Sequence, residues 1–154
     1  MAIEIFQKLQ SFITNLTYKE TSSNTESFIE TSKKFETIYF VIVSDTLGSS
    51  ILRAYQIADQ LRSKLGEGKI KVVNQSEVKK RTRNSLFIWI KHINPKLIKK
   101  LKHNVHIYDV IDNFIYQYDD VVKSLNENIV DGVIVNNNYM VDDIVKTTTY
   151  HSLL

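Results

Sequence analysis

Five short apolar runs, each followed by a longer polar or amphipathic segment, constrain the fold of this chain more than any other feature. The runs cover residues 38–43, 69–73, 86–90, 105–110 and 132–135. Their apolar residues mostly follow one another without alternation, which is typical of strands buried on both faces of a sheet. Apolar residues at helical spacing lie in segments 49–65, 95–102, 114–125 and 139–146. The first helix would bury Ile51 and end at Gly66, and the second would begin at Pro95 with Asn94 as its cap. Strand and helix are expected to alternate throughout, which predicts an α/β, three-layer, Rossmann-like domain. Its mainly parallel sheet of about five strands would have helices on both faces.

The chain is expected to have two parts. Residues 2–16 carry apolar side chains at helical spacing, and residues 17–34 form a polar, Ser- and Thr-rich segment. We predict an N-terminal helix with a polar linker at 1–36, the helix packing back on the domain, and the Rossmann-like domain at 37–154. A length of 154 residues is enough for one domain with a real core.

Composition excludes several kinds of site. The absence of cysteine excludes disulfides, thiolate zinc sites, iron–sulfur ligation and cysteine nucleophiles. The sequence has no run of about 18 apolar residues, so no membrane-spanning helix is predicted. The first residues lack the basic region and cleavage site of a signal peptide. We therefore expect a cytoplasmic location, with peripheral contact to a membrane left open.

The net charge of +3 is unevenly distributed. Residues 64–103 contain twelve Lys and Arg against Glu67 and Glu77, a net +10, whereas residues 104–154 carry a net −6. A basic region of this size indicates either a solvated surface or a face for an anionic partner, such as nucleic acid, anionic lipid or a sugar phosphate.

In an open parallel sheet, ligands bind beyond the carboxyl ends of the strands. The loop after the first apolar run is therefore the first candidate ligand-binding segment. Gly48 would allow a tight turn or the close approach of a ligand. Ser49 or Ser50 would cap the following helix, whose N-terminus favours an anion, and Arg53 would add a charged contact. The simpler interpretation is a capped turn. Neither a GxGxxG fingerprint nor the GK[ST] of a P-loop is present.

Polar side chains accompany the later runs as well: His92 after the third, Asp109, Asp112 and Asn113 at the fourth, and Asn136, Asn137 and Asn138 after the fifth. Together they would line a cleft in which His92 acts as base or donor and Asp112 holds His92 or a sugar hydroxyl. The alternative is that Asp109 and Asp112 cap the next helix. The remaining histidines have no partner at metal-ligand spacing, so they are interpreted as surface or core residues and no metal site is predicted.

Four segments together resemble the N-terminal half of a two-Rossmann-domain (GT-B type) glycosyltransferase. They are SSILRAYQIADQL (49–61), IKHINP (90–95), YDVIDN (108–113) and VDGVIVNNNYM (130–140). The resemblance covers residues 37–146 and rests on the order and position of the segments. It implies that the acceptor binds mainly to this domain and the nucleotide-sugar mainly to a C-terminal domain. Reaction would occur in the cleft between them, without a metal or other cofactor.

The resemblance also implies site residues. It puts Asp112 and Asn113 where an acceptor-side polar group or base is often found, and the predicted catalytic residues are Asp112 together with His92, which comes from the sheet-edge argument above. The substrate-binding residues would be Leu47, Gly48, Ser49, Ser50, Arg53, Asn113, Asn136, Asn137 and Asn138. The loop at Gly48 departs from the family pattern, because it has one glycine where many relatives have several. The donor-binding domain with its acidic motif does not lie within these 154 residues, so we expect them to be inactive or nearly so by themselves.

Alternatives of other classes stay open. The basic residues 96–102 could face an anionic membrane or a phosphorylated acceptor. The run KKRTR at 79–83 could bind nucleic acid, but Phe87 and Trp89 fall in an apolar run and are expected in the core, which disfavours this partner. A non-catalytic module that binds an anionic ligand or a protein partner, or assembles as a homo-oligomer, is the third alternative.

Overall fold

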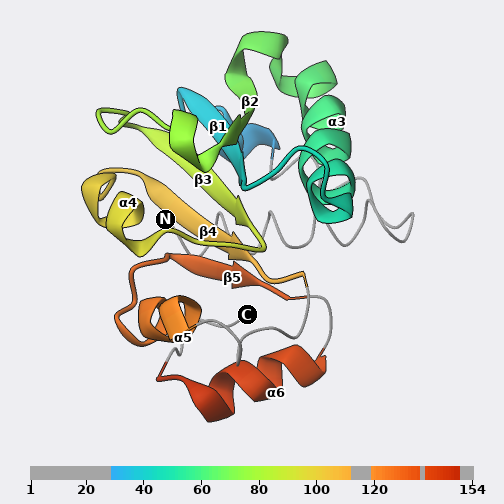
Figure 1. Ribbon diagram of the computed structural model, residues 1–154. Helices are drawn as coiled ribbons and strands as arrows, with labels where there is room; N and C mark the ends of the chain where they lie inside the picture. Colours follow the sequence, from blue (N-terminus) through green and yellow to red (C-terminus); the bar gives the residue numbers. More distant parts are fainter. Residues whose placement is uncertain (1–28, 112–118, 136–137, 150–154) are drawn as a thin grey trace.

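A five-stranded, all-parallel sheet forms the centre of the molecule (Figure 1). The computed structural model describes residues 29–111, 119–135 and 138–149; the helix predicted at 2–16 lies outside them. The strands are β1 (Thr37–Ile42), β2 (Ile70–Asn74), β3 (Ser85–Ile90), β4 (Val105–Asp109) and β5 (Gly132–Ile134). Their spatial order is β2-β1-β3-β4-β5. The predicted parallel sheet and the Rossmann-like fold class are confirmed.

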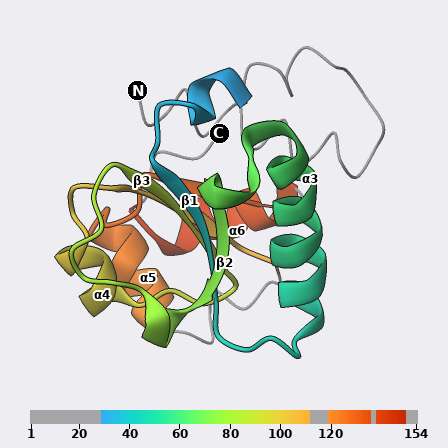
Figure 2. The same cartoon turned by 90° about the horizontal axis from the view of Figure 1, so that it is seen from above.

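Helices cover both faces of the sheet (Figure 2). Helix α3 (Gln56–Leu65) packs on one face, and α4 (Pro95–Lys100), α5 (Asp119–Asn126) and α6 (Asn138–Thr147) contribute to the core on the other. Strand β3 divides its residues between the two cores: Leu86, Ile88 and Ile90 join α3, whereas Phe87 and Trp89 join the opposite cluster. All six residues of β3 are buried, which explains why this run shows no polar alternation.

A row of rings crosses the sheet on the α4 side. Tyr39 and Phe87 are stacked with ring centroids 4.7 Å apart, and Phe87 lies 5.3 Å from His106. Trp89 Nε1 donates to His106 Nδ1 at 3.1 Å, so the ring proton of His106 is on Nε2, 3.0 Å from the Leu101 carbonyl oxygen. Burial lowers the pKa of His106 and favours this neutral form. The expected core positions of Phe87 and Trp89 are confirmed.

A π-helical turn, η1 (Ser50–Tyr55), precedes α3 without a break. The Gln56 N–H donates to the Ile51 carbonyl oxygen, five residues back. Ile51 was expected on the buried face but is 47% exposed, whereas Ile57 is buried. The reason is that a five-residue bond spacing places an extra residue in the turn and so rotates the following face.

The alternation of strand and helix fails between β2 and β3. Residues 75–84, all of them described, contain only the short 3-10 turn η3 (Gln75–Glu77). Val78 is the single apolar residue in this segment. Because a helix needs an apolar stripe to pack against a sheet, the segment crosses as a loop instead.

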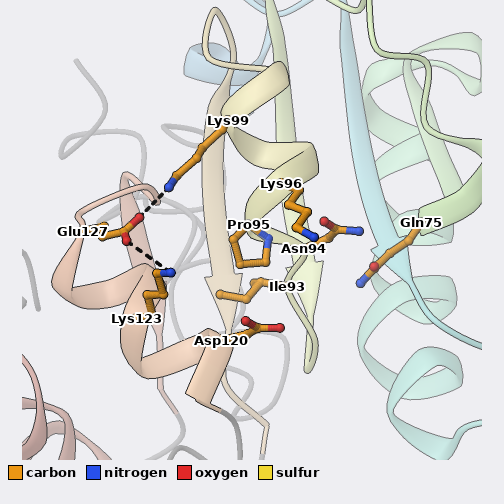
Figure 3. A pocket seen from close by; sticks show the side chains of 9 residues that line it. All are labelled: Gln75, Ile93, Asn94, Pro95, Lys96, Lys99, Asp120, Lys123 and Glu127. Atoms are coloured by element: carbon orange, nitrogen blue, oxygen red, sulfur yellow. Dashed lines mark hydrogen bonds and ion pairs between the residues drawn. The ribbon is translucent and has the colours of Figure 1, made fainter.

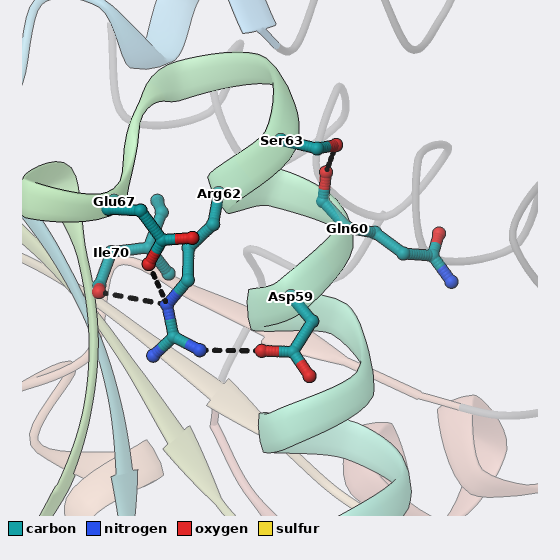
Figure 4. Close-up of polar contacts among 6 residues, drawn as sticks. All are labelled: Asp59, Gln60, Arg62, Ser63, Glu67 and Ile70. Carbon is teal, nitrogen blue, oxygen red and sulfur yellow. Dashed lines mark hydrogen bonds and ion pairs between the residues drawn. The ribbon is translucent and has the colours of Figure 1, made fainter.

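The junction of α3 with β2 has the stop signal that the sequence predicts. Gly66 caps α3 with a φ of 95°, in the left-handed region that favours glycine, and its N–H donates to Arg62 O at 2.9 Å. Arg62 Nη1 donates to Asp59 at 2.5 Å and its Nε to the Ile70 carbonyl oxygen at 3.4 Å (Figure 4). Arg62 therefore joins the end of the helix to the first residue of β2.

The polar segment at 17–34 was expected to be a linker, and its described end differs from that expectation. Residues 29–32 are helical. Thr31 and Ser32 are buried, and Phe35 belongs to the core on the α3 side. Apolar packing of Phe35 therefore holds this part of the segment against the domain.

Candidate functional site

The strand order indicates where a ligand would bind. Connections run from β1 outward to β2, and from β3 outward through β4 to β5, so the order reverses between β1 and β3. In doubly wound sheets, this reversal leaves a crevice at the carboxyl ends of the two strands. The residues that follow β1 and β3 therefore form the first candidate site.

The loop after β1 is held by side-chain hydrogen bonds at both of its ends. Tyr55 Oη donates to Asp45 Oδ1 at 2.7 Å, and this bond is the main cause that raises the pKa of Tyr55. Asn74 Nδ2 donates to the Val43 carbonyl oxygen at 2.7 Å, which joins the loop to the end of β2. The loop is thus positioned by η1 on one side and by β2 on the other.

The predicted roles of Gly48 and Ser49 are partly corrected. Gly48 does not have a positive φ, so the turn does not require glycine. An added Cβ would have no atom within 4 Å, so the space beside Gly48 is open. Ser49 occupies the N-cap position, but its side chain makes no capping hydrogen bond because the residue is itself in the helical region.

Neighbouring side chains of the same loop divide between the interior and the surface. Ser50 is 2% exposed, and Leu47 is on the outside, 38% exposed. Ile51 and Leu52 lie further into η1 and are also exposed. The outer surface of the loop is therefore more apolar than its Ser-rich sequence indicates.

The turn after β3 contains a strained residue. Lys91 has a φ of 64°, and the His92 N–H donates to the Ile90 carbonyl oxygen at 2.7 Å. A hydrogen bond across one residue with positive φ defines a γ-turn of the rare, strained kind. Strand β4 holds it in place: Lys91 N–H donates to Asp109 O at 3.0 Å, and Tyr108 Oη donates to Lys91 O at 2.8 Å. Backbone strain of this kind concentrates at functional sites.

His92, the predicted base, is half-buried immediately after this turn. Burial is the main cause that lowers its pKa, and the positive charge of Lys91 lowers it further. The imidazole is therefore neutral at pH 7 and able to accept a proton.

Asp109 is the most unusual titratable residue at this edge. It ends β4, is 0% exposed, and within the described part of the chain its carboxylate oxygens have no hydrogen-bond partner. Ile107 packs on the α3 side, so strand alternation places Asp109 on the same side. Burial raises the pKa of Asp109 to about 6, and the positive charge of Arg53, a predicted site residue, opposes this rise. Arg53 and Asp109 are thus brought together from η1 and β4.

Several predicted residues lie outside the described ranges. They are Asp112, Asn113, Asn136 and Asn137, together with the side chain of Asn138, the first residue of α6. Of the predicted site residues, the structure therefore places only those of the loop at 47–50, Arg53 and His92.

A hollow of about 410 Å³ lies beside the turn after β3, on the α4 face (Figure 3). Lys99 and Lys123 both point to Glu127, at 2.6 Å and 3.9 Å, and Gln75 lies on the opposite side. Gln75 Nε2 also donates to the His92 carbonyl oxygen at 3.3 Å. The volume is within the range of small-molecule sites. Sequence reasoning missed this hollow, because its residues come from three separate connections.

The N-terminus of α4 lines part of the same hollow, and this helix begins at the residues that the sequence predicts. Pro95 is the first helical residue, and Asn94 Oδ1 accepts a hydrogen bond from the Leu97 N–H at 3.1 Å. Asn94 therefore fixes the direction in which the chain leaves β3.

The described residues contain no group of three or more His, Cys, Asp or Glu able to hold a metal ion. Nor does any helix within those residues have the length and apolarity needed to cross a membrane. Comparison of the chain with protein-family models, curated proteins and solved structures finds no match. A functional assignment therefore depends on the site itself and on the sequence resemblance.

Proposed function

We propose that this domain is the acceptor-side, N-terminal half of a GT-B type glycosyltransferase. The complete reaction would move a sugar from a nucleotide-sugar to an acceptor hydroxyl. One observation carries the proposal: of the segments on which the resemblance rests, 90–95 and 108–113 start at the carboxyl ends of β3 and β4, and 49–61 follows the loop after β1. These are the adjacent central strands beside the crevice where doubly wound domains bind ligands.

The proposed chemistry assigns a role to each side of the crevice. The acceptor hydroxyl would lie near His92, whose neutral imidazole takes the proton as the oxygen attacks the anomeric carbon. The nucleoside diphosphate leaves with the electron pair of the broken glycosidic bond. The loop at 47–50 and Arg53 would contact the phosphates or the acceptor, and Asp112 would hold His92 or a sugar hydroxyl. Asn113 and Asn136–Asn138 would contribute to the edge of the cleft.

The test is NMR chemical-shift mapping of the 154-residue chain against a panel of methyl and octyl glycosides. We expect shifts at Arg53, His92 and the loop at 47–50. His92→Gln should weaken glycoside binding, whereas the matched variant His103→Gln, at the opposite end of the sheet, should not. The absence of shifts across the panel, or shifts confined to other surfaces, would contradict the proposal.

The second candidate function is a non-catalytic assembly module formed by two copies of this chain. The exposed side chains of Leu47, Ile51 and Leu52, at 38%, 47% and 59%, support it because all three come from the loop after β1 and the start of η1, where the Ile51 N–H donates to the Leu47 carbonyl oxygen. Sedimentation should then show a dimer that Leu52→Asp dissociates. A monomer at all concentrations would rule out this candidate.

A further inference from the structure

The amino end of the sheet, opposite the crevice, carries a basic hollow of about 380 Å³. Its cations, Lys80, Arg81, Arg83, Lys100 and Lys102, come from the loop before β3 and from the end of α4 with the turn after it, and His103 also lines it. No Asp or Glu is among its lining residues. We call this surface the basic hollow.

Asn104 joins the two segments that form the basic hollow. Its Nδ2 donates to the Thr82 carbonyl oxygen at 2.8 Å and to the Leu101 carbonyl oxygen at 2.9 Å. Its Oδ1 accepts a hydrogen bond from the Ser85 N–H at 3.0 Å. Both basic runs are therefore fixed at the amino ends of the neighbouring strands β3 and β4, and the cations are held together before any ligand arrives.

The Lys and Arg of the basic hollow have no carboxylate partner among the residues that the structure describes. Within the described ranges, Lys33, Arg62, Lys99 and Lys123 each pair with an Asp or Glu, whereas none of the Lys and Arg of the basic hollow does. Asp131 lines a separate hollow together with Lys102, and its Oδ2 accepts a hydrogen bond from the His106 N–H at 2.8 Å. Positive charge thus accumulates in a concave surface without compensation.

The surroundings of the basic hollow define the chemistry of its ligand. Phe87 and Trp89, the aromatic residues of the adjacent strand, are fully buried and offer no platform for stacked bases. Leu101, the apolar residue of the lining, is 1% exposed, so no apolar side chain projects toward a lipid bilayer. Guanidinium and ammonium groups on a concave surface match several phosphate groups on one small molecule.

We propose that the basic hollow binds a compact ligand with several phosphate groups. The site lies at the other end of the strands from the crevice, so this inference is independent of the proposed transferase function. Each can fail while the other holds.

Isothermal titration calorimetry with inorganic tripolyphosphate tests the proposal. We expect one site per chain, with an affinity that falls as salt concentration rises. Arg83→Gln/Lys102→Gln should weaken binding by at least about tenfold, since each substitution removes a charge-assisted contact. The matched control is Lys34→Gln/Lys64→Gln, which removes two exposed cations elsewhere and should change affinity by less than about twofold. All four side chains are exposed, so both variants are expected to fold, as circular dichroism will check.

Three results would overturn the proposal. The first is no binding of tripolyphosphate at low salt. The second is equal weakening by the hollow variant and the control, which would indicate general attraction to net charge. The third is binding of duplex oligonucleotides or of phosphatidylglycerol vesicles in the absence of tripolyphosphate binding, which would assign the surface to a nucleic acid or a membrane instead.

Discussion

The two ends of the parallel sheet carry different chemistry on the same strands. The carboxyl end combines a strained turn at Lys91, a neutral His92 and a buried Asp109 with exposed apolar side chains. The amino end has uncompensated cations, held in place by Asn104. The length of the strands therefore separates the proposed site for proton transfer, at the carboxyl end, from the proposed site for anions, at the amino end.

The largest expected effect comes from Trp89, which lies between the two ends and belongs to neither. Trp89→Ala removes a ring that is 0% exposed and leaves His106 Nδ1 without its donor. We expect a loss of about 3–5 kcal/mol in the free energy of unfolding, measured by urea titration with far-UV circular dichroism. Trp89→Phe should lose much less. A loss below about 1 kcal/mol in the free energy of unfolding for the alanine variant would contradict the tight packing of Trp89 in the centre of the sheet.

Two asparagines, one at each end, allow the same substitution to be compared. Asn104→Ala removes three hydrogen bonds at the amino end and should cost about 2–3 kcal/mol. Asn94→Ala removes one helix cap at the carboxyl end and should cost about 1 kcal/mol. Urea unfolding measures both values.

The same pair sharpens the functional contrast between the ends. Asn104→Ala should also weaken tripolyphosphate binding, whereas Asn94→Ala should leave it unchanged. Two results would contradict the role of Asn104 in positioning the basic hollow. One is a larger loss of stability for Asn94→Ala than for Asn104→Ala, and the other is an equal effect of the two substitutions on tripolyphosphate binding.

The last predicted effect concerns the pH dependence of stability at the carboxyl end. The pKa of Asp109 is raised from 3.8 to about 6 in the folded state, so the folded chain binds more protons than the unfolded chain between these values. Stability from this group is therefore present at low pH and is lost as pH rises through about 6. Between pH 4.5 and 7.5 the loss is about 2 kcal/mol.

Asp109→Asn should remove this contribution. The difference in unfolding free energy between the variant and the original chain should shift by that amount in favour of the variant from pH 4.5 to 7.5, as measured by urea titration at both values. Asp142→Asn, on the exposed surface of α6, is the matched control for the loss of one carboxylate. A pH-independent difference for Asp109→Asn would mean that Asp109 titrates normally.

Sequence patterns predicted the sheet because its signals are local. Unbroken apolar runs gave strands close to the observed limits, and Gly66, Asn94 and Pro95 marked helix ends at the expected residues. The order of the strands could not be predicted, because it depends on pairing between distant segments. The π-helical turn at Ser50–Tyr55 was also hidden, since its apolar residues fit an ordinary helix nearly as well.

The candidate site was less accessible to sequence reasoning. An Asp at the end of an apolar run indicates a helix cap as readily as a buried carboxylate, so the sequence alone does not separate these two roles for Asp109. The basic hollow required knowing that β3 and β4 are neighbours. One signal was present: each of its two basic runs stands immediately before an apolar run, at the start of a predicted strand. In a parallel sheet such runs lie at one end, and adjacent strands bring them together.

The helix-free crossing between β2 and β3 has a consequence for motion. On the α4 side, β1 and β2 are covered by a loop that contributes Val78, whereas β3 and β4 lie under α4 and α5. Opening the loop exposes little apolar surface, so it costs less free energy than global unfolding. The amides of β2, an edge strand, will therefore exchange with deuterium sooner than those of β3. The molecule therefore has an edge that opens easily and a rigid centre. The basic hollow lies across both: its residues 80–83 belong to this loop, where Asn104 Nδ2 holds the Thr82 carbonyl oxygen, and its residues 100–103 belong to the rigid part.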